Sequence, residues 1–149
     1  MGTHYEGTEA EILALDCYIK LFRATESVGQ RINAHLREHD LTTSQFGVLE
    51  ALYHLGPMQH NELGQKILKT SGNMTMVIDH LEKQGYVTRQ RREDDRRCVD
   101  ILLTEPGRTL IEAILPAHVA GVVVAFSALT TAEQTQLAAL CRTLGLAQV

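Results

Sequence analysis

Arginine is concentrated in one short, strongly charged segment of this sequence. Five arginines lie within nine residues, with three acidic residues among them: Arg89, Arg91, Arg92, Arg96 and Arg97, with Glu93, Asp94 and Asp95. Guanidinium groups bind phosphate oxygens through paired hydrogen bonds, so this ridge could contact the backbone of a duplex or a narrow minor groove. A solubilising loop, or a tip closed by internal Asp–Arg pairs, is the alternative explanation.

A second candidate surface lies on a helix that we expect to be capped by Thr70 and Ser71 and to end at Gly85. Its apolar residues share one face, and the residues outside that face are mostly small or polar: Ser71, Gly72, Asn73, Thr75, Met76, His80 and Lys83. Asn and Thr can read base edges in the major groove, and the N–H groups of the first turn can meet phosphate. An ordinary solvated face is the alternative. Asp79 would be repelled by phosphate, so we expect it to pair with Lys83 four residues later.

The cysteines, the histidines and the short motifs of the sequence do not indicate an enzyme. The three cysteines form no Cys-x-x-Cys pair, so neither a disulfide framework nor a zinc site is indicated. His35 and His39 have a metal-compatible spacing, but no nearby ligand completes the set, and we predict no metal and no cofactor. The sequence has no phosphate-binding glycine loop, nucleophile motif or metalloprotease motif.

Length and charge narrow the class of protein further. The 149 residues suit one domain with appended helices, and the net charge of −4 excludes a general polycation that coats nucleic acid. The start of the chain is polar and acidic, unlike a signal peptide. Residues 113–132 carry no charge but several polar groups, so we interpret them as a buried helix and its turn. We therefore expect a cytoplasmic protein that does not enter a membrane.

The elements that must position these residues follow from capping signals and periodicity. Thr-x-x-Glu or Gln sequences at Thr8, Thr42 and Thr130 predict three helix starts, the first helix running to about Arg37 and the second stopping at Gly56. Further helices are predicted over 61–68, 71–85 and from Thr104 onward, and a hairpin is predicted from 86–92 and 98–103. The order over residues 40–104 is that of a winged helix-turn-helix: a mainly α fold with a small β-hairpin wing.

Three motifs in this order resemble the multiple-antibiotic-resistance regulator (MarR) family of bacterial transcription factors. The most specific is the segment from Asp95 to Gly107, similar to the family's Asp-x-Arg wing and its Leu-Thr-x-x-Gly entry to the next helix. The segments 41–49 and 71–87 support it. The resemblance implies a DNA-binding transcriptional regulator, a repressor that binds double-stranded DNA. It also implies that Arg97 reaches DNA and that Asp95 orients an arginine through a salt bridge.

The resemblance further implies a homodimer. Residues 8–39 and 105–146 would form a dimerisation domain of N- and C-terminal helices around the module at 40–104, and the dimer would bind a pseudo-palindromic operator. The strongly apolar helix near residues 110–126 independently calls for a covering partner. Small aromatic or phenolic effectors switch many relatives. A winged-helix protein-interaction module is the alternative from another functional class.

A redox role for Cys17 is a narrower hypothesis. One branch of the family senses peroxides through a cysteine in the first helix that is followed by an aromatic residue, and here Tyr18 follows Cys17. Cys17 is displaced by about one position from that branch's cysteine, which turns its side chain by roughly 100° around the helix. A structural cysteine is the alternative.

Overall fold

The computed structural model describes residues 3–67 and 71–147, which fall into two compact units. One unit spans residues 35–118, and the other combines the chain up to residue 34 with the chain from residue 119. The first unit contains the predicted 40–104 module together with the turn before it and the first half of the helix after it. Each unit is described by itself.

The first helix, α1 (Glu9–Asn33), begins at a Thr8–Glu11 capping box, as predicted. It ends four residues before the predicted Arg37, and the chain continues as a 3-10 turn, η1 (Ala34–His39). Helix α2 (Thr43–Leu55) starts at the predicted Thr42–Gln45 capping box and stops at Gly56, which has a positive φ of 80°. Glycine suits this position because residues with a Cβ rarely adopt that backbone conformation.

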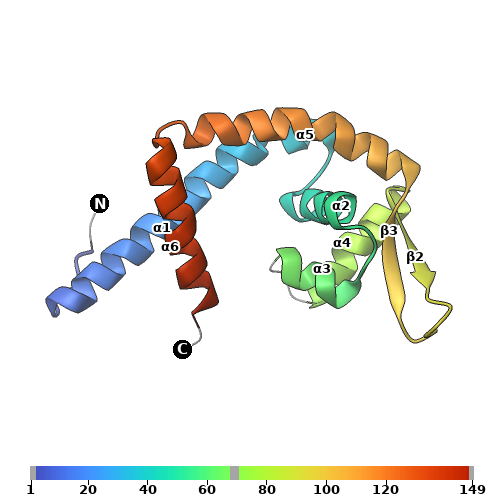
Figure 1. Cartoon of the computed structure of the whole chain (residues 1–149), viewed down its shortest axis with the longest axis horizontal. Coiled ribbons are helices and arrows are strands. Elements are labelled where there is room, and N and C mark those ends of the chain that lie inside the picture. Colours follow the sequence, from blue (N-terminus) through green and yellow to red (C-terminus); the bar gives the residue numbers. More distant parts are fainter. Residues whose placement is uncertain (1–2, 68–70, 148–149) are drawn as a thin grey trace. The chain divides into compact units, whose positions relative to one another are not determined.

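The helix-turn-helix consists of α3 (His60–Ile67) and α4 (Ser71–Lys83). Both helices pack against α2, and Leu49, Leu63 and Ile78 are fully buried among them. Figure 1 shows α2, α3 and α4 on one side of strands β2 and β3. The predicted end of the third helix at Leu68 and the cap at Thr70 lie outside the described residues.

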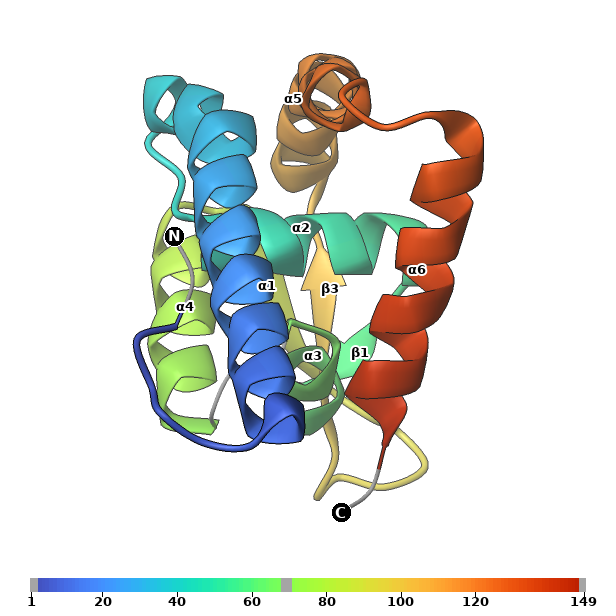
Figure 2. The ribbon, with the colours of Figure 1, turned by 90° about the vertical axis from the view of Figure 1, so that its left-hand side faces the viewer.

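The wing is a three-stranded antiparallel sheet in the order β1-β3-β2. Strands β2 (Val87–Arg91) and β3 (Val99–Leu103) form the predicted hairpin, with Arg89 opposite Ile101. The sequence did not predict β1 (Met58–Gln59), which pairs with β3 through Met58 and Ile101 and is visible beside it in Figure 2. The fold class of a mainly helical winged helix-turn-helix is confirmed.

The last two helices are α5 (Glu105–Phe126) and α6 (Thr131–Leu146), the latter starting at the predicted Thr130–Glu133 capping box. Residues 113–132 form the predicted helix and its turn, but in the single chain most of this helix segment is not buried. In α5 only Gly107, Ile111 and Ile114 are buried, and Val123 and Val124 are exposed. The second half of α5 is apolar, and its own chain leaves it exposed. Another surface is therefore needed to cover it.

Candidate nucleic-acid interface

Helix α4 separates an apolar face from a polar one, as its periodicity predicts. Met74, Ile78 and Leu81 have no exposed surface and hold the helix in the core of the winged module. The residues on the opposite side are exposed: Gly72, Asn73, Thr75, Met76, Asp79, His80 and Lys83. The backbone of Ser71 starts the helix, but its side chain lies outside the described residues. The predicted recognition face, apart from Ser71, is therefore accessible on one helix.

One member of this face has a partner that the sequence did not indicate. The ring nitrogen Nε2 of His60, the first residue of α3, lies 3.1 Å from Oγ1 of Thr75. This contact joins the two helices of the helix-turn-helix at the recognition face. No local pattern could reveal it, because the two residues are fifteen positions apart.

A tight C-cap directs the chain from α4 into the wing. Gly85 adopts a positive φ of 78°, the N–H of Gly85 donates to the carbonyl of Glu82, and the N–H of Tyr86 donates to the carbonyl of Leu81. These two bonds form a Schellman motif, which turns the chain sharply after the helix. Strand β2 therefore starts close to the last turn of α4, and its side chains can reach that turn.

Arg89 on β2 uses this proximity to bind two carboxylates of α4. Its Nη2 lies 2.5 Å from Oδ1 of Asp79, and its Nη1 lies 2.7 Å from Oε1 of Glu82. Burial alone would lower the pKa of Arg89, but the hydrogen bonds and charges of Asp79 and Glu82 outweigh it and raise the pKa above its ordinary value. The expected pairing of Asp79 with Lys83 is wrong, because Asp79 bonds to Arg89 instead.

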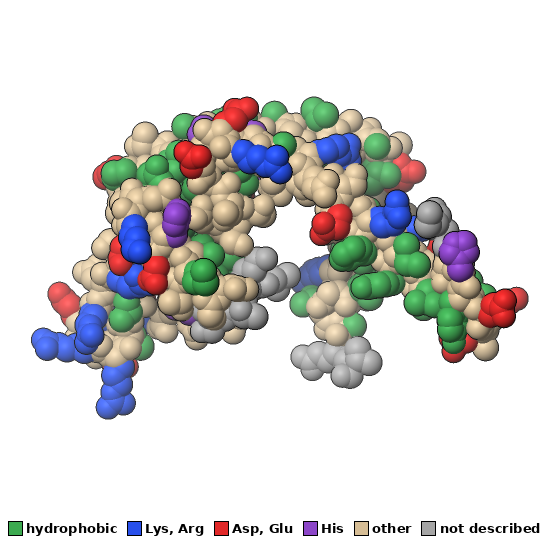
Figure 3. All heavy atoms as spheres, turned by 180° about the vertical axis from the view of Figure 1, so that it is seen from behind, with side chains coloured by type: hydrophobic (Ala, Val, Ile, Leu, Met, Phe, Trp, Pro, Cys, Tyr) green, Lys and Arg blue, Asp and Glu red, His purple; other side chains and the backbone are tan. Residues whose placement is uncertain are grey.

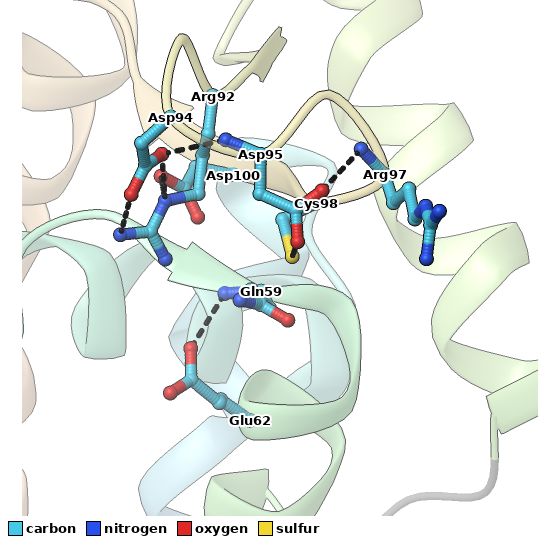
Figure 4. Close-up of polar contacts among 8 residues, drawn as sticks. All are labelled: Gln59, Glu62, Arg92, Asp94, Asp95, Arg97, Cys98 and Asp100. Carbon is cyan, nitrogen blue, oxygen red and sulfur yellow. Dashed lines mark hydrogen bonds and ion pairs between the residues drawn. The ribbon is translucent and has the colours of Figure 1, made fainter.

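The hairpin tip has its own ion pairs, drawn in Figure 4. Nε of Arg92 lies 3.2 Å from Oδ1 of Asp94 and 3.9 Å from Oδ2 of Asp100. Asp95 accepts a hydrogen bond from the backbone N–H of Arg97 at 3.0 Å. The resemblance implied a salt bridge between Asp95 and an arginine. In the described chain Asp95 instead shapes the turn, and Asp94 binds the guanidinium.

Three arginines of the hairpin have no ion-pair partner among the described residues: Arg91, Arg96 and Arg97. All three are exposed, and Arg91 and Arg96 line an open hollow with Arg92 and Glu93. Figure 4 shows the Arg97 side chain directed away from the acidic residues of the tip, and Figure 3 shows Lys and Arg gathered at that end of the molecule (lower left). The positive charge at the tip is therefore available to an anionic partner.

The cysteines and histidines are spread over both units. Cys17 on α1 and Cys141 on α6 are exposed, whereas Cys98 is half-buried directly before β3, with its Sγ 3.7 Å from Oδ2 of Asp95. Burial first, then the Asp95 carboxylate, raises the pKa of the Cys98 thiol. The ring of His35 lies 5.3 Å from that of His118, and no group of three or more potential metal ligands occurs among the described residues.

Comparison with known proteins agrees with this geometry. The MarR family model matches residues 41–99. The HTH-type transcriptional regulators YkoM (uncharacterized) and MhqR of Bacillus subtilis are 36% and 35% identical to the chain over 133 residues, which are 89% of this chain and 86% and 92% of theirs. The crystal structure of AbsC, a MarR family transcriptional regulator from Streptomyces coelicolor, has a TM-score of 0.82 at 22% identity and covers 95% of each chain. This chain therefore belongs to the MarR family of DNA-binding transcriptional regulators, which are not enzymes.

Proposed function

We propose that the protein is a cytoplasmic, homodimeric repressor that binds a pseudo-palindromic operator and releases it when a small molecule or an oxidant acts on it. The observation that carries the DNA contact is the placement of the arginines that have no ion-pair partner among the described residues. An acidic protein presents Arg91, Arg96 and Arg97 at one tip, next to a polar helix face. That arrangement suits phosphate binding by the wing and base reading by α4.

The residues that we assign to DNA contact fall into two groups. Ser71, Gly72, Asn73, Thr75, Met76, His80 and Lys83 lie on α4, where side chains near the N-terminus can reach the major groove. Arg91, Arg92, Arg96 and Arg97 lie on the wing and would bind the backbone or the minor groove, with Asp95 holding the turn. Arg89 is not in the second group, because its guanidinium is ion-paired to Asp79 and Glu82 of α4.

The uncovered apolar surface of the terminal helices supports a dimer. No described residue of α1 or α6 is buried in the single chain. Large apolar side chains exposed on these helices and on α5 include Leu13, Phe22, Val123, Val124, Leu140 and Leu144. A second copy of the same helices would cover such a surface, because symmetric dimers bury self-complementary patches.

Helix α5 is long and apolar enough to cross a membrane by length and composition alone. Its first half, however, belongs to the core of the winged module, where Ile111 and Ile114 are buried. A helix that is built into a core over two turns cannot lie in a bilayer along its whole length. We therefore assign its apolar second half to the dimer.

An aromatic or phenolic acid is the effector class that the terminal helices suit. A hollow of about 330 Å³ is lined by Ala120, Gly121, Val124 and Ala125, with Arg31 as its charged residue. A flat apolar ring could lie against the small side chains while its carboxylate or phenolate meets the guanidinium. Such binding would act on the dimerisation helices and not on the DNA-contacting residues.

The test of the function is a mobility-shift measurement at two salt concentrations, with a duplex enriched from a random pool by the protein and with an unrelated duplex. A DNA-binding regulator prefers the enriched duplex and loses affinity steeply as salt rises, because bound phosphates release counterions. A winged-helix protein-interaction module would show neither property.

A further inference from the structure

Arg89 differs from the other arginines of the hairpin in what it connects. Its guanidinium bridges β2 to the last two turns of α4, through Asp79 at 2.5 Å and Glu82 at 2.7 Å. Its backbone N–H also donates to Oε2 of Glu82 at 3.2 Å. Arg92 is ion-paired as well, but its partners Asp94 and Asp100 both belong to the hairpin. Arg89 alone among the five hairpin arginines is ion-paired to α4 within the described chain.

We propose that Arg89 is a positioning residue, which fixes the wing against the recognition helix and offsets part of the charge of two carboxylates of that helix, and that it does not itself bind DNA. This inference rests on the proposed function. It replaces the expectation, drawn from the arginine run, that Arg89 contacts DNA.

Two N–H donors of Arg89, one on each terminal nitrogen, already bond carboxylates. A guanidinium has five N–H donors in a planar fork, and both of its terminal nitrogens face carboxylates here. The side chain is also less exposed than either partner, at 31% against 50% for Asp79 and 39% for Glu82. A phosphate that approached Arg89 would also meet the two carboxylates bound to it, whereas Arg97 has no ion-pair partner among the described residues.

Charge supplies the second reason. Asp79 belongs to the outward side of α4, where an uncompensated carboxylate would repel the phosphate backbone. The bridge to Arg89 offsets part of that charge and holds the Asp79 carboxylate toward the wing. The sequence alone presents Asp79 as an obstacle to DNA binding, and the ion pair with Arg89 reduces that obstacle.

The ion pairs between Arg89 and α4 also affect how well the protein distinguishes one DNA sequence from another. The wing and α4 have to meet the same half-site together, so the distance between them must match the spacing of the grooves. A wing that moves freely could still hold phosphate, but it would no longer set the register in which α4 meets the bases. Loss of Arg89 should therefore reduce the preference for one DNA sequence over another more than it reduces the affinity for DNA in general.

The experiment compares Arg89→Ala and Arg97→Ala with the wild type, using the enriched duplex, the unrelated duplex and a series of salt concentrations. Arg89→Ala is expected to lower the ratio of the two affinities about tenfold, the cost of roughly one lost base contact, while the salt slope stays at the wild-type value. Arg97→Ala is expected to reduce the slope by about 1 and to keep the ratio.

An Asp79→Asn/Glu82→Gln double variant keeps Arg89 and the shapes of its partners but removes the ion pairs. It is expected to lower the affinity ratio as Arg89→Ala does, although it removes two negative charges. A salt slope that falls by about 1 in Arg89→Ala would show that Arg89 acts as a phosphate contact, and a double variant that keeps the ratio would show that the ion pairs do not position the wing. The proposed function itself would instead be overturned if the wild type neither preferred the enriched duplex nor lost affinity as the salt concentration rises.

Discussion

The backbone of Gly107 packs directly against the carbonyl group of Tyr86, so closely that a Cβ on Gly107 would overlap the oxygen. Thr104 secures the same junction: its hydroxyl donates to the carbonyl of Gly85 at 2.6 Å, and its N–H donates to that of Tyr86 at 3.1 Å. The hydroxyl of Thr104 also accepts the N–H of Gly107, which caps the start of α5. The end of α4, the start of the wing and the start of α5 are therefore joined at one point.

Substitution Gly107→Ala should loosen this junction. The added methyl would meet the carbonyl oxygen of Tyr86 and would lie 2.9 Å from Cδ1 of Leu103, and the oxygen belongs to backbone that cannot rotate away. Overpacking of this kind costs about 1–3 kcal/mol, which outweighs the better helix propensity of alanine. We expect a lower melting temperature at a fixed protein concentration.

Gly72→Ala is the matched control for this prediction. A Cβ on Gly72 has no atom within 4 Å, and alanine is the better helix former, so the melting temperature should stay the same or rise. Equal destabilisation by the two substitutions would contradict the role of Gly107 as a site of close backbone approach.

Much of the fold could be predicted because its signals are local. Each Thr-x-x-Glu or Gln sequence at Thr8, Thr42 and Thr130 forms a complete capping box, since both partners lie within one helical turn. The buried set Met74, Ile78 and Leu81 follows from helical spacing alone. Strand β1 could not be predicted, because two residues after Pro57 carry no periodicity and exist as a strand only through pairing with β3.

The candidate site likewise has features that local sequence signals predict and contacts that they do not. The exposed face of α4 and the arginine-rich tip could be predicted from composition and period. The partner of Asp79 could not, because Lys83 is its neighbour along the helix, whereas Arg89 reaches it only through the turn at Gly85 and the path of β2. The contact of His60 with Thr75 is non-local in the same way. Pairings that depend on tertiary geometry leave no trace in spacing.

Substitutions on α4 and substitutions on the wing should affect DNA binding differently. Asn73→Ala or Thr75→Ala is expected to relax base preference at the position it reads, at a cost of about 1–3 kcal/mol on the preferred duplex and little on an unrelated one. Arg97→Ala should weaken both duplexes alike, because phosphate contacts carry no sequence information. Affinities for a panel of single-base variants of the enriched duplex distinguish these outcomes. Uniform loss of affinity from Asn73→Ala would contradict base reading.

The dimer proposal predicts a selective effect of charge on the terminal helices. Val123 is 64% exposed on α5, and Val123→Glu would place a carboxylate in the proposed interface, where burial of an unpaired charge is costly. We expect sedimentation equilibrium to give twice the 16.6 kDa mass for the wild type, and a dissociation constant at least about tenfold weaker for Val123→Glu.

Leu55→Glu serves as the control for the dimer. Leu55 is exposed to a similar extent, 59%, but it ends α2 in the winged module. Its substitution should leave the mass of the assembly unchanged. A monomeric wild type, or equal weakening by both substitutions, would contradict a dimer built on the terminal helices.

Stability should decline in mild acid through His118. Burial, followed by the nearby His35, lowers the pKa of His118 from its usual 6.5, and Glu50 only partly opposes this. The unfolded chain therefore binds the proton more readily, so stability falls as pH drops below about 6.5 and levels off below the folded pKa. The melting temperature should change less between about pH 7.5 and 5.5 in His118→Gln than in the wild type or in a variant of the exposed His39.

Cys17 provides a direct test of oxidant-dependent release. Its thiol is exposed on α1, whereas Cys98 is half-buried with a raised pKa, and a thiol reacts through its thiolate form. If Cys17 is the redox switch, peroxide or quinone should release the enriched duplex from the wild type but not from Cys17→Ser, and a thiol reductant should restore binding after mild peroxide. Cys98→Ser and Cys141→Ser should still respond as the wild type does. Equal release from the wild type and Cys17→Ser would contradict the redox role and leave Cys17 as a structural residue.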